Sequence, residues 1–415
     1  MAKKICILTQ SHLCRNPRVV KEANSLAKAG FDVTILTTFT FADLLEEDLK
    51  LIDTNKIKYK GIINMIPGQS SRWYRLKNRL ERRIAGELIG RLNWENIQAL
   101  GYDYRTNLKA AIHENADLYT CHQEMSTVIG CKLIQRGYRV AFDFEDWYSH
   151  DLLPEANKTR PIRLLEKYEI YALNNSVLSY TTSVSMANDF AEFAQSKAPK
   201  VLHNVFPWAE RNYMDGELRD RKNRDKPSIH WYSQTVGPGR GLEFIVESLN
   251  LLNQPVELHL RGNVSQAFKE DLHQIFPAHL GHELHFHALV PHLELLSRIA
   301  EHDIGLATEK STPPSRDLTI TNKILQYLLA GIAVVASNTS GQKEVAIEAP
   351  DSVFLYENDN KEQFAQALNN LINNPKILKK AKASALKVAE EKFCWEKQET
   401  WLTQWISDSI KNVSS

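Results

Sequence analysis

A repeated strand–helix–strand pattern constrains the fold of this chain more than any other feature of its sequence. An apolar run at 4–9 is followed by a helical pattern over 17–28, a stop at Gly30 and a second apolar run at 32–37. This order predicts a βαβ unit. Such units build parallel sheets with right-handed crossovers, so we expect an α/β protein.

The pattern continues along the chain as two α/β series. The first has further strands at 116–121, 139–144, 176–182 and 201–206, and the second has strands at 228–233, 256–262, 283–289, 303–308 and 332–337. We predict two doubly wound Rossmann-like domains facing each other across a cleft, with ligands at the carboxyl ends of the strands. The predicted boundaries are 1–205 for the N-terminal domain, 206–227 for a charged linker, 228–392 for the C-terminal domain and 393–415 for a C-terminal helix.

Composition excludes several other classes of protein. Of the 415 residues, 43% are hydrophobic and 24% are charged, which is typical of a soluble globular protein rather than a disordered or collagen-like chain. Five scattered cysteines lack Cys-x-x-Cys spacing, which argues against a disulfide framework or a thiolate zinc site. With no secretory signal or membrane-spanning stretch in view, we expect a cytoplasmic protein.

The formal net charge of +1 hides an uneven distribution. Residues 1–205 hold 28 basic and 23 acidic residues, and the remainder is mildly acidic. Because the total charge is close to zero, nucleic acid is not an expected partner. Segment 72–92 has seven basic and two acidic residues, with apolar residues at helical spacing. Such a helix suits an anionic membrane, which predicts peripheral attachment to the inner face of the cell membrane. The alternative is a core-facing helix with a solvated basic side.

Six segments carry a family resemblance, and they occur in one order along the chain. They are Arg18–Gly30, Ala116–Glu124, Asp143–Asp146, Lys200–Asn204, Gln234–Glu243, and Gly305–Ala307 with Asn322–Ala336. Together they resemble the retaining, nucleotide-sugar-dependent glycosyltransferases of family 4, which have the two-domain GT-B fold. The resemblance implies a hexosyltransferase that moves a sugar from a nucleotide diphosphate to a saccharide or lipid-linked acceptor. UDP is the expected nucleotide, and cell-surface glycan or glycolipid biosynthesis is the expected setting.

The resemblance also implies how the chain divides this work. The N-terminal domain is expected to bind the acceptor, and the C-terminal domain is expected to bind the nucleotide sugar. The C-terminal helix is expected to cross back to the N-terminal domain.

Candidate donor-binding residues follow the strands of the C-terminal domain. The diphosphate leaving group gains negative charge as its bond to the sugar breaks, so catalysis needs fixed cations and N–H dipoles. Arg240 lies in a Gly-Pro-Gly-Arg-Gly loop, and Lys323 lies in the first turn of a helix that favours anions. We predict that these two residues and His122 are catalytic. The predicted donor-binding residues are Gln234, Gly239, Arg240, Glu309, Thr319, Asn322, Lys323 and Gln326.

Polar residues also follow two strands of the N-terminal domain, where the ligand groups of an open α/β sheet project. The resemblance makes His122 a contact to the donor sugar or the acceptor. The predicted acceptor-binding residues are Glu124, Asp143, Glu145 and Asp146. For His122 the structural alternative is a buried, hydrogen-bonded histidine, and for Asp143 it is a carboxylate that caps a loop.

Four positions depart from the pattern of the family. Gln326 and Leu318 replace the two glutamates of its Glu-x7-Glu signature, Gln234 replaces an arginine, and Glu145 replaces a histidine. Glu309 or Asp317 would then supply a carboxylate to the donor sugar. These departures leave open a non-catalytic homologue that binds a sugar nucleotide or a partner. The shared architecture leaves open a nucleotide-sugar 2-epimerase.

No resident metal or cofactor is expected. Six histidines between His273 and His292 mix strand, loop and helix positions. We therefore expect them to be structural or exposed rather than metal ligands.

Overall fold

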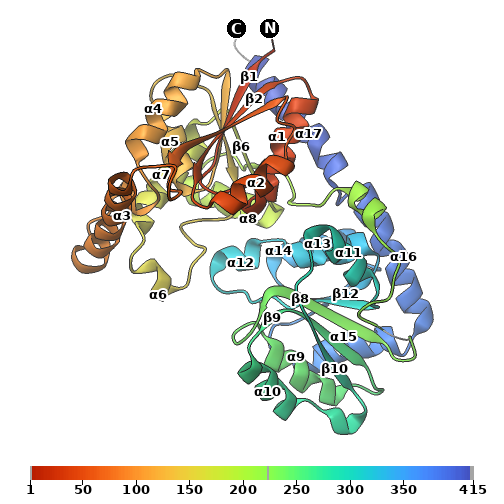
Figure 1. Ribbon diagram of the computed structural model, residues 1–415. Coiled ribbons are helices and arrows are strands. Elements are labelled where there is room, and N and C mark those ends of the chain that lie inside the picture. The colour runs from red at the N-terminus through yellow and green to blue at the C-terminus, as the bar shows by residue number, and fades with distance from the viewer. Residues whose placement is uncertain (1, 222–223, 412–415) are drawn as a thin grey trace. The chain divides into compact units, whose positions relative to one another are not determined.

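The computed structural model describes residues 2–221 and 224–411, which belong to two compact units (Figure 1). The first unit combines the chain up to Leu202 with the segment that starts at Glu399, and the second unit is His203–Gln398. The chain therefore passes between the units twice, once after Leu202 and once inside helix α17 (Trp395–Lys411). The first unit is discontinuous in sequence.

The first unit contains a parallel sheet of seven strands in its described residues, in the order β3-β2-β1-β4-β5-β6-β7. The strands are β1 (Lys4–Leu8), β2 (Asp32–Phe39), β3 (Ile57–Asn64), β4 (Leu118–His122), β5 (Val140–Phe144), β6 (Leu178–Thr181) and β7 (Lys200–Val201). The helices are α1 (Pro17–Lys28), α2 (Ala42–Lys50), α3 (Arg72–Leu92), α4 (Tyr104–Glu114), α5 (Glu124–Ile134), α6 (Pro154–Asn157), α7 (Ile162–Asn175) and α8 (Val184–Ala194). Figure 1 shows α4 and α5 on one face of the sheet and α1 on the other.

The second unit repeats this strand order in its described residues, as β10-β9-β8-β11-β12-β13. The strands are β8 (Ser228–Val236), β9 (Glu257–Val264), β10 (Glu283–His287), β11 (Ile304–Ala307), β12 (Ala333–Ser337) and β13 (Val353–Tyr356). The helices are α9 (Leu242–Ser248), α10 (Gln266–Ile275), α11 (His292–Ala300), α12 (Pro314–Leu318), α13 (Asn322–Ala330), α14 (Ser340–Glu348), α15 (Lys361–Ile372) and α16 (Pro375–Glu391). The strands supply fully buried apolar residues such as Ile229, Leu258 and Val335, which pack into one core with α9 and α15.

Both sheets confirm the predicted α/β architecture, and their strand order creates the ligand-binding position of the fold. The order reverses between β1 and β4 in the first unit and between β8 and β11 in the second. At such a switch point, the loops after the two neighbouring strands diverge and leave a crevice at their carboxyl ends. Each unit therefore offers one crevice of this kind.

The sequence prediction was wrong at one predicted strand and missed several elements. The predicted strand 201–206 is reduced to β7, because the backbone leaves the sheet at His203, where its N–H binds the Gln398 side chain at 3.0 Å. Strands β3 and β13 were not predicted, and neither were helices α2, α4, α6, α7, α8, α12 and α14.

Residues 206–221, part of the predicted linker, are held against the second unit. Arg221 is buried and pairs with Asp303 at 2.9 Å, and Arg298 pairs with Asp215 at 2.5 Å. In the first unit, the segment that begins at Glu399 packs on α1. The Glu399 carboxylate accepts hydrogen bonds from Ser25 at 2.9 Å and Lys28 at 3.0 Å.

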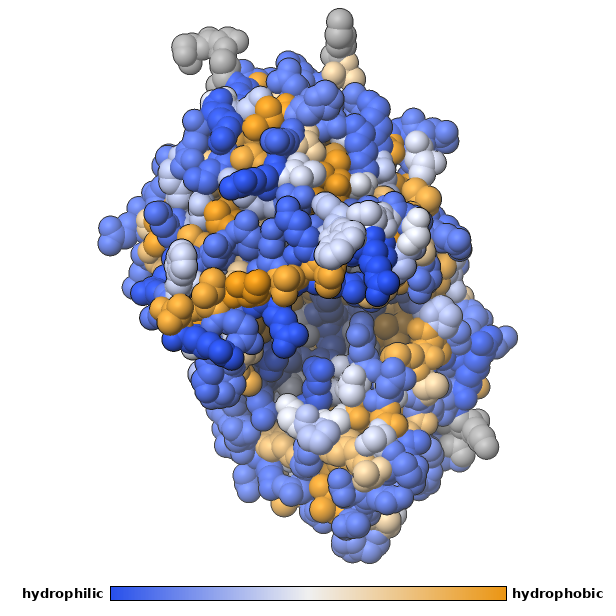
Figure 2. Space-filling view, turned by 60° about the vertical axis from the view of Figure 1, so that its left-hand side comes forward, coloured by the Kyte–Doolittle hydropathy of each residue, from blue (hydrophilic) through white to orange (hydrophobic). Residues whose placement is uncertain are grey.

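Helix α3 turns its apolar residues outward. Asn78, Ala85 and Ile89 face the unit, while the apolar stripe, defined here as Trp73, Leu76, Leu80, Ile84 and Leu92, is 48–81% exposed. A continuous hydrophobic band crosses the face shown in Figure 2, where this helix lies. The alternative of a core-facing helix is therefore wrong for this stripe. Among the described helices, none has an apolar stretch long enough to cross a bilayer.

Candidate functional site

The glycine-rich loop of the second unit follows β8 at the switch point. Gly239 and Gly241 have φ values of 75° and 76°, a left-handed conformation that disfavours residues with a side chain. Gly241 caps α9, so the N–H groups of that first turn point toward the carboxyl end of the sheet. Gln234 and Arg240 are both exposed. Within the described residues, Arg240 makes no hydrogen bond or ion pair, so its guanidinium is free to meet a ligand.

Lys323 and Glu309 meet at the same edge of this sheet. The Lys323 Nζ lies 2.6 Å from Glu309 Oε1 and 5.5 Å from the centre of the Trp231 ring. Lys323 is in the first turn of α13, as predicted, and Thr321 caps this helix by accepting from the Lys323 N–H at 3.4 Å. Burial would raise the pKa of Glu309, but Lys323 holds it below its usual range. The ion pair also stabilises Lys323 at a helix end where the dipole opposes a cation.

The other predicted donor residues have separate partners. Gln326 is buried, and its side-chain oxygen accepts a hydrogen bond from the Tyr232 hydroxyl. The Thr319 hydroxyl donates to the Ser315 carbonyl at 2.7 Å, and exposed Asn322 accepts from Asn204 at 3.3 Å. The structure therefore brings Lys323 and Glu309 into direct contact. It gives Gln326 a structural partner, and it leaves Gln234 and Arg240 exposed.

His122 lies at the centre of a buried charge cluster in the first unit. Its Nδ1 is 2.7 Å from Glu145 Oε1 and 3.4 Å from Asp143 Oδ2, and its Nε2 is 3.0 Å from Glu22 Oε2. Arg18 binds Asp143 through two nitrogens, with Nη2 2.9 Å from Oδ1. The His122 ring is 0% exposed. In this structure it contacts protein carboxylates, so its catalytic role stays a prediction.

The electrostatics of this cluster keep the histidine charged. Burial would lower the pKa of His122, but Glu22 and Glu145 raise it to about 10. Burial likewise opposes ionisation of Glu22, yet His122 holds the pKa of that carboxyl below its usual range. The imidazolium and the carboxylates therefore stabilise one another inside the protein.

The remaining predicted acceptor residues divide between an ion pair and an isolated carboxyl. Glu124 opens α5 and pairs with Arg160. Asp146 is half-buried, and its burial and the negative charges of Asp151 and Glu145 raise its pKa to about 7. Asp146 is thus a carboxyl that changes its charge close to neutral pH.

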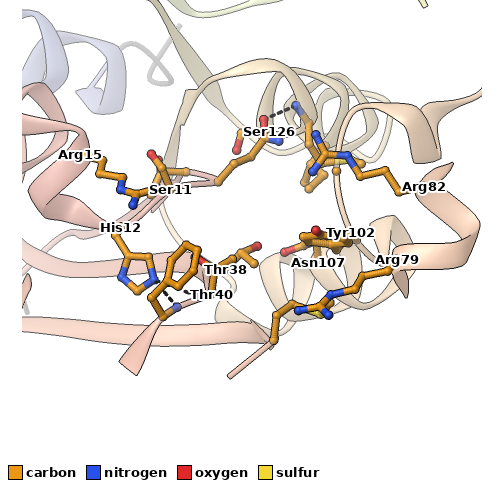
Figure 3. A pocket seen from close by; sticks show the side chains of 17 residues that line it. Ser11, His12, Arg15, Thr38, Thr40, Arg79, Arg82, Tyr102, Asn107 and Ser126 are labelled. Carbon is orange, nitrogen blue, oxygen red and sulfur yellow. Dashed lines mark hydrogen bonds between the residues drawn. The ribbon is translucent and has the colours of Figure 1, made fainter. Parts of the chain in front are cut away.

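A pocket of about 340 Å³ lies at the switch point of the first unit, and the sequence did not reveal it (Figure 3). Its walls come from the loops after β1 and β2, the starts of α4 and α5, and α3. Arg15 extends into it from one side, and Arg79 and Arg82 extend from the other (Figure 3). None of the predicted acceptor residues lines this pocket. Its lining residues are scattered over distant segments, so no spacing in the sequence marks them as a set.

Two groups of side chains have the spacing of metal ligands among the described residues. Glu22, His122 and Asp143 form one, and Glu257, Glu283 and His285 form the other. Arg18 and Tyr180 already bind the carboxylates of the first group, and Lys226 and Arg221 pair with those of the second. Acidic side chains that the sequence pattern did not indicate lie beside two of the predicted structural histidines. His285 Nε2 is 3.4 Å from Glu283 Oε2, and His287 Nδ1 is 3.2 Å from Asp220 Oδ1, a residue distant in sequence.

Two of the predicted structural histidines, His285 and His287, belong to a stack of histidine rings across the second sheet that also includes His230, His259 and His302. Ring centres of His230 and His302 are 4.5 Å apart, those of His302 and His259 are also 4.5 Å apart, and His259 lies 4.6 Å from His285 and 5.2 Å from His287. Burial, reinforced by the neighbouring histidines, holds the pKa values of His230, His259 and His302 below the usual range. His230, His259 and His302 are therefore neutral packing groups.

Sequence reasoning missed Arg18 and Glu22 as members of the buried cluster. Both stand on the buried face of α1, four residues apart, beside the apolar residues Val19, Ala23 and Leu26. Charged residues within the apolar stripe of an amphipathic helix were the available signal, because a buried charge requires a partner.

Comparisons with known proteins agree with this fold. Residues 226–374 match the family described as "Glycosyl transferases group 1". A search of curated proteins finds no match. Similar solved structures include sucrose-phosphate synthase from Thermosynechococcus elongatus, with 12% identity over 98% of both chains and a TM-score of 0.68. Anabaena Alr3699/HepE in complex with UDP and glucose is 15% identical over 98% of this chain and 100% of its own, with a TM-score of 0.65.

An isomerase is also among the similar structures. The putative UDP-N-acetylglucosamine 2-epimerase from Listeria monocytogenes is 13% identical over 100% of this chain and 98% of its own, with a TM-score of 0.57. At such identities the likeness shows the fold, which is GT-B. The recognised resemblance to glycosyltransferases is thus confirmed by the family match over most of the second unit and by the fold of the whole chain.

Proposed function

We propose that this protein is a retaining glycosyltransferase that moves a hexose-type sugar from a UDP-linked donor to a saccharide or lipid-linked acceptor. The observation that carries the proposal is the glycosyl transferases group 1 match at 226–374, a region that includes the glycine-rich loop and the Lys323–Glu309 pair. The Anabaena structure with UDP and glucose supports this choice of donor. Cell-surface glycan or glycolipid biosynthesis is the corresponding setting.

In this proposal the second unit binds the donor. The bond between the anomeric carbon and the diphosphate oxygen breaks, and UDP leaves with the bonding electron pair. The acceptor oxygen bonds to the anomeric carbon from the same face, and its proton passes to the leaving phosphate oxygen. Arg240 and Lys323 stabilise the charge that develops on the diphosphate, and Glu309 accepts hydrogen bonds from sugar hydroxyls.

The first unit binds the acceptor in this proposal. Glu124, Glu145 and Asp146 would offer carboxylate oxygens to acceptor hydroxyls. Asp143 and buried His122 would act through Glu145, which His122 holds at 2.7 Å. No resident metal is assigned to the reaction, because fixed cations of the chain supply the charge. Turnover should therefore continue in the presence of a chelator, and loss of activity that added Mg²⁺ or Mn²⁺ restores would contradict this assignment.

We also propose that the protein is cytoplasmic and attaches to the inner face of the cell membrane through α3. The exposed apolar stripe lies among seven basic residues, and each basic residue near an anionic surface contributes about 1 kcal/mol. Sedimentation with anionic vesicles should recover the wild-type protein. The variant Trp73→Ser/Leu76→Ser/Leu80→Ser should stay in the supernatant. A matched triple variant of exposed apolar residues elsewhere, Leu251→Ser/Ile275→Ser/Ile347→Ser, should bind normally. Equal sedimentation of both variants would remove the membrane proposal.

Two other functions have an observation in their favour. The Listeria structure keeps a nucleotide-sugar 2-epimerase as an alternative. Gln326, bound to Tyr232 where the family has a glutamate, keeps a non-catalytic homologue as another. Incubation with a panel of nucleotide sugars, followed by product analysis, separates these functions. Sugar transfer or donor hydrolysis supports the proposal, inversion at C2 supports an epimerase, and binding without turnover supports a non-catalytic protein.

A further inference from the structure

The charge of the first unit's pocket identifies a chemical class of acceptor. Three arginines, Arg15, Arg79 and Arg82, line it, and no aspartate or glutamate is among its lining residues. None of the three is paired with a carboxylate within the described part of the chain. The adjoining pocket, of about 430 Å³, shares Arg79 and Arg82 with the first, but Glu87 and Glu124 also line it, so only the first pocket has no acidic lining residue.

His12, the one histidine among the lining residues of this pocket, does not change the pocket's charge. His12 Nδ1 lies 2.7 Å from Asp48, and its Nε2 accepts from the N–H groups of Thr40 and Phe41 at 3.0 and 3.2 Å. A nitrogen that accepts two hydrogen bonds carries no proton, so the ring is neutral. Its role is to hold the loop after β2 in place. The three guanidinium groups therefore give the cavity a net positive charge.

We propose that the acceptor carries a phosphate group, which Arg15, Arg79 and Arg82 bind in this pocket. This inference rests on the proposed function and names the acceptor's charged group. A phosphate monoester carries nearly two negative charges and three terminal oxygens, so it can engage several guanidinium groups at once. Ser11, Thr38 and Thr40 add hydroxyl groups to the same walls.

The pocket is held in shape by neighbouring groups. Arg15 lies 5.2 Å from the ring centre of Phe41, and Arg82 lies 5.3 Å from that of Tyr102, so each guanidinium stacks on a wall of the cavity. Gln123 has φ 71° and ψ 171°, and its side-chain oxygen accepts from the Gln10 N–H at 2.8 Å. This backbone conformation is strained, and such strain persists only where surrounding contacts enforce it, as they often do at binding sites.

The phosphate could belong to a soluble sugar phosphate or to a lipid-linked sugar. Arg79 and Arg82 lie on α3, the helix whose other side carries the exposed apolar stripe. A phosphate at the membrane surface and a phosphate in solution could therefore both meet these residues. The shared chemistry is the phosphate ester, and the experiment has one arm for each source.

The test measures binding to the full chain. Glucose 6-phosphate is the soluble probe, with glucose as its uncharged counterpart. Neutral phosphatidylcholine vesicles that contain a polyprenyl phosphate are the lipid probe, with plain vesicles as their counterpart. The variant is Arg79→Ala/Arg82→Ala. The control is Arg105→Ala, an exposed arginine of helix α4 in the same unit that lies outside the pocket. UDP binding is measured for every variant as a separate report on the second unit.

We expect at least one phosphate probe to bind more tightly than its counterpart. The double variant should weaken that binding about 100-fold, because each charge-assisted contact is worth about tenfold or more. Arg105→Ala should leave it unchanged. Binding of glucose 6-phosphate alone identifies a soluble acceptor, and binding of the lipid probe alone identifies a lipid-linked one.

Two results would overturn the inference. One is that neither phosphate probe binds more tightly than its counterpart, and the other is that the double variant binds as well as Arg105→Ala. If UDP binding and sugar transfer are normal in these cases, only the phosphate inference fails. Absence of both UDP binding and sugar transfer would instead refute the proposed function, whatever the pocket binds.

Discussion

At the scale of single residues, Arg240 and Lys323 differ in what they do before a donor arrives. Lys323 is already paired with Glu309, whereas exposed Arg240 makes no ion pair in the described residues. A diphosphate would have to compete with Glu309 for Lys323, but Arg240 loses only its hydration. A substitution of Arg240 therefore tests the role of a cation at the diphosphate more directly than a substitution of Lys323.

We expect Arg240→Ala to lower kcat/KM at least about 100-fold, because one fixed cation at the leaving group is worth roughly 3 kcal/mol. The melting temperature should change little, since the side chain is exposed. Lys376→Ala, an exposed cation on α16, is the matched control and should leave kcat/KM unchanged. Near-wild-type turnover of Arg240→Ala would exclude the role assigned to this residue.

The raised pKa of Asp146 predicts that the stability of the protein depends on pH. The folded-state pKa is raised from 3.8 to about 7, so between these values the folded protein keeps a proton that the unfolded chain releases. Stability therefore falls as the pH rises from 4 to 7. Asp146→Asn should remove this loss and raise the free energy of unfolding at pH 8 by about 1–2 kcal/mol, with little effect at pH 4.

Urea denaturation at both pH values measures this difference. Glu155→Gln removes an exposed carboxylate from the same unit and serves as the control, with no expected pH-dependent gain. An equal gain for both variants would show that net charge, rather than burial of Asp146, sets the effect.

At the scale of elements, strands β8, β9 and β10 and the turn before β11 carry the histidine stack. Neutral buried histidines remain unprotonated when the folded protein enters acid, whereas the unfolded chain binds protons below about pH 6.5. Their contribution to stability is complete above that pH and is lost as the pH falls. The second unit should therefore unfold progressively more easily between pH 6.5 and 5.

His230→Phe should reduce this acid sensitivity. His230 is fully buried, so its loss removes about 1.4 kcal/mol of destabilisation per pH unit below 6.5, or about 2 kcal/mol at pH 5. The comparison is the variant's change in unfolding free energy at pH 5 against that at pH 8. His279→Phe, at an exposed position, should show no such difference. An equal shift at both pH values would mean that packing, not protonation, is what the substitution alters.

The sequence predicted elements best where one strong local pattern determined them. The run 4–9 and the helix at 17–28 were identifiable because strand and helix periods are clear there. Strand β3 was missed because Lys58 and Lys60 alternate with Ile57 and Tyr59, so the strand lacks the continuous apolar run that marked the others. These lysines are tolerated because β3 is an edge strand whose charged side chains reach solvent or carboxylates such as Asp32.

The candidate site was predictable only in part, for a similar reason. Lys323 at a helix start is a local feature, and the structure places it there. Its partner Glu309 comes from the loop after another strand, so their ion pair depends on the tertiary fold. The arginine pocket depends on it even more, because Arg15 and Arg79 are far apart in sequence and only the sheet order brings them to one cavity.

At the scale of the whole molecule, the two units repeat one strand order but use different charges at their switch points. The first presents an acid-free pocket with three arginines, and the second presents a lysine–glutamate pair beside a glycine-rich loop. Two crevices with separate chemistry suit a reaction between two substrates. If both proposals hold, titrations with UDP and with glucose 6-phosphate should report on the two units separately.

The discontinuous first unit also predicts how the chain responds to truncation. A chain that stops after Gln398 would lose the Glu399 contacts to Ser25 and Lys28, together with the contacts of Arg139 to the Ser409 and Ile410 carbonyls. We expect this truncation to make α1 and the strand around Arg139 exchange their amide hydrogens faster, while the second unit stays protected. Hydrogen exchange by mass spectrometry measures this, and faster exchange in the second unit instead would contradict it.

Helix α17 therefore has a consequence for biosynthesis. The ribosome makes most of the first unit before any of the second, yet the first unit receives its last helical segment only after the whole second unit has emerged. Until then, the surface of α1 that Glu399 contacts stays uncovered and is accessible to chaperones and proteases. The half of the protein that is made first is thus the half that is finished last.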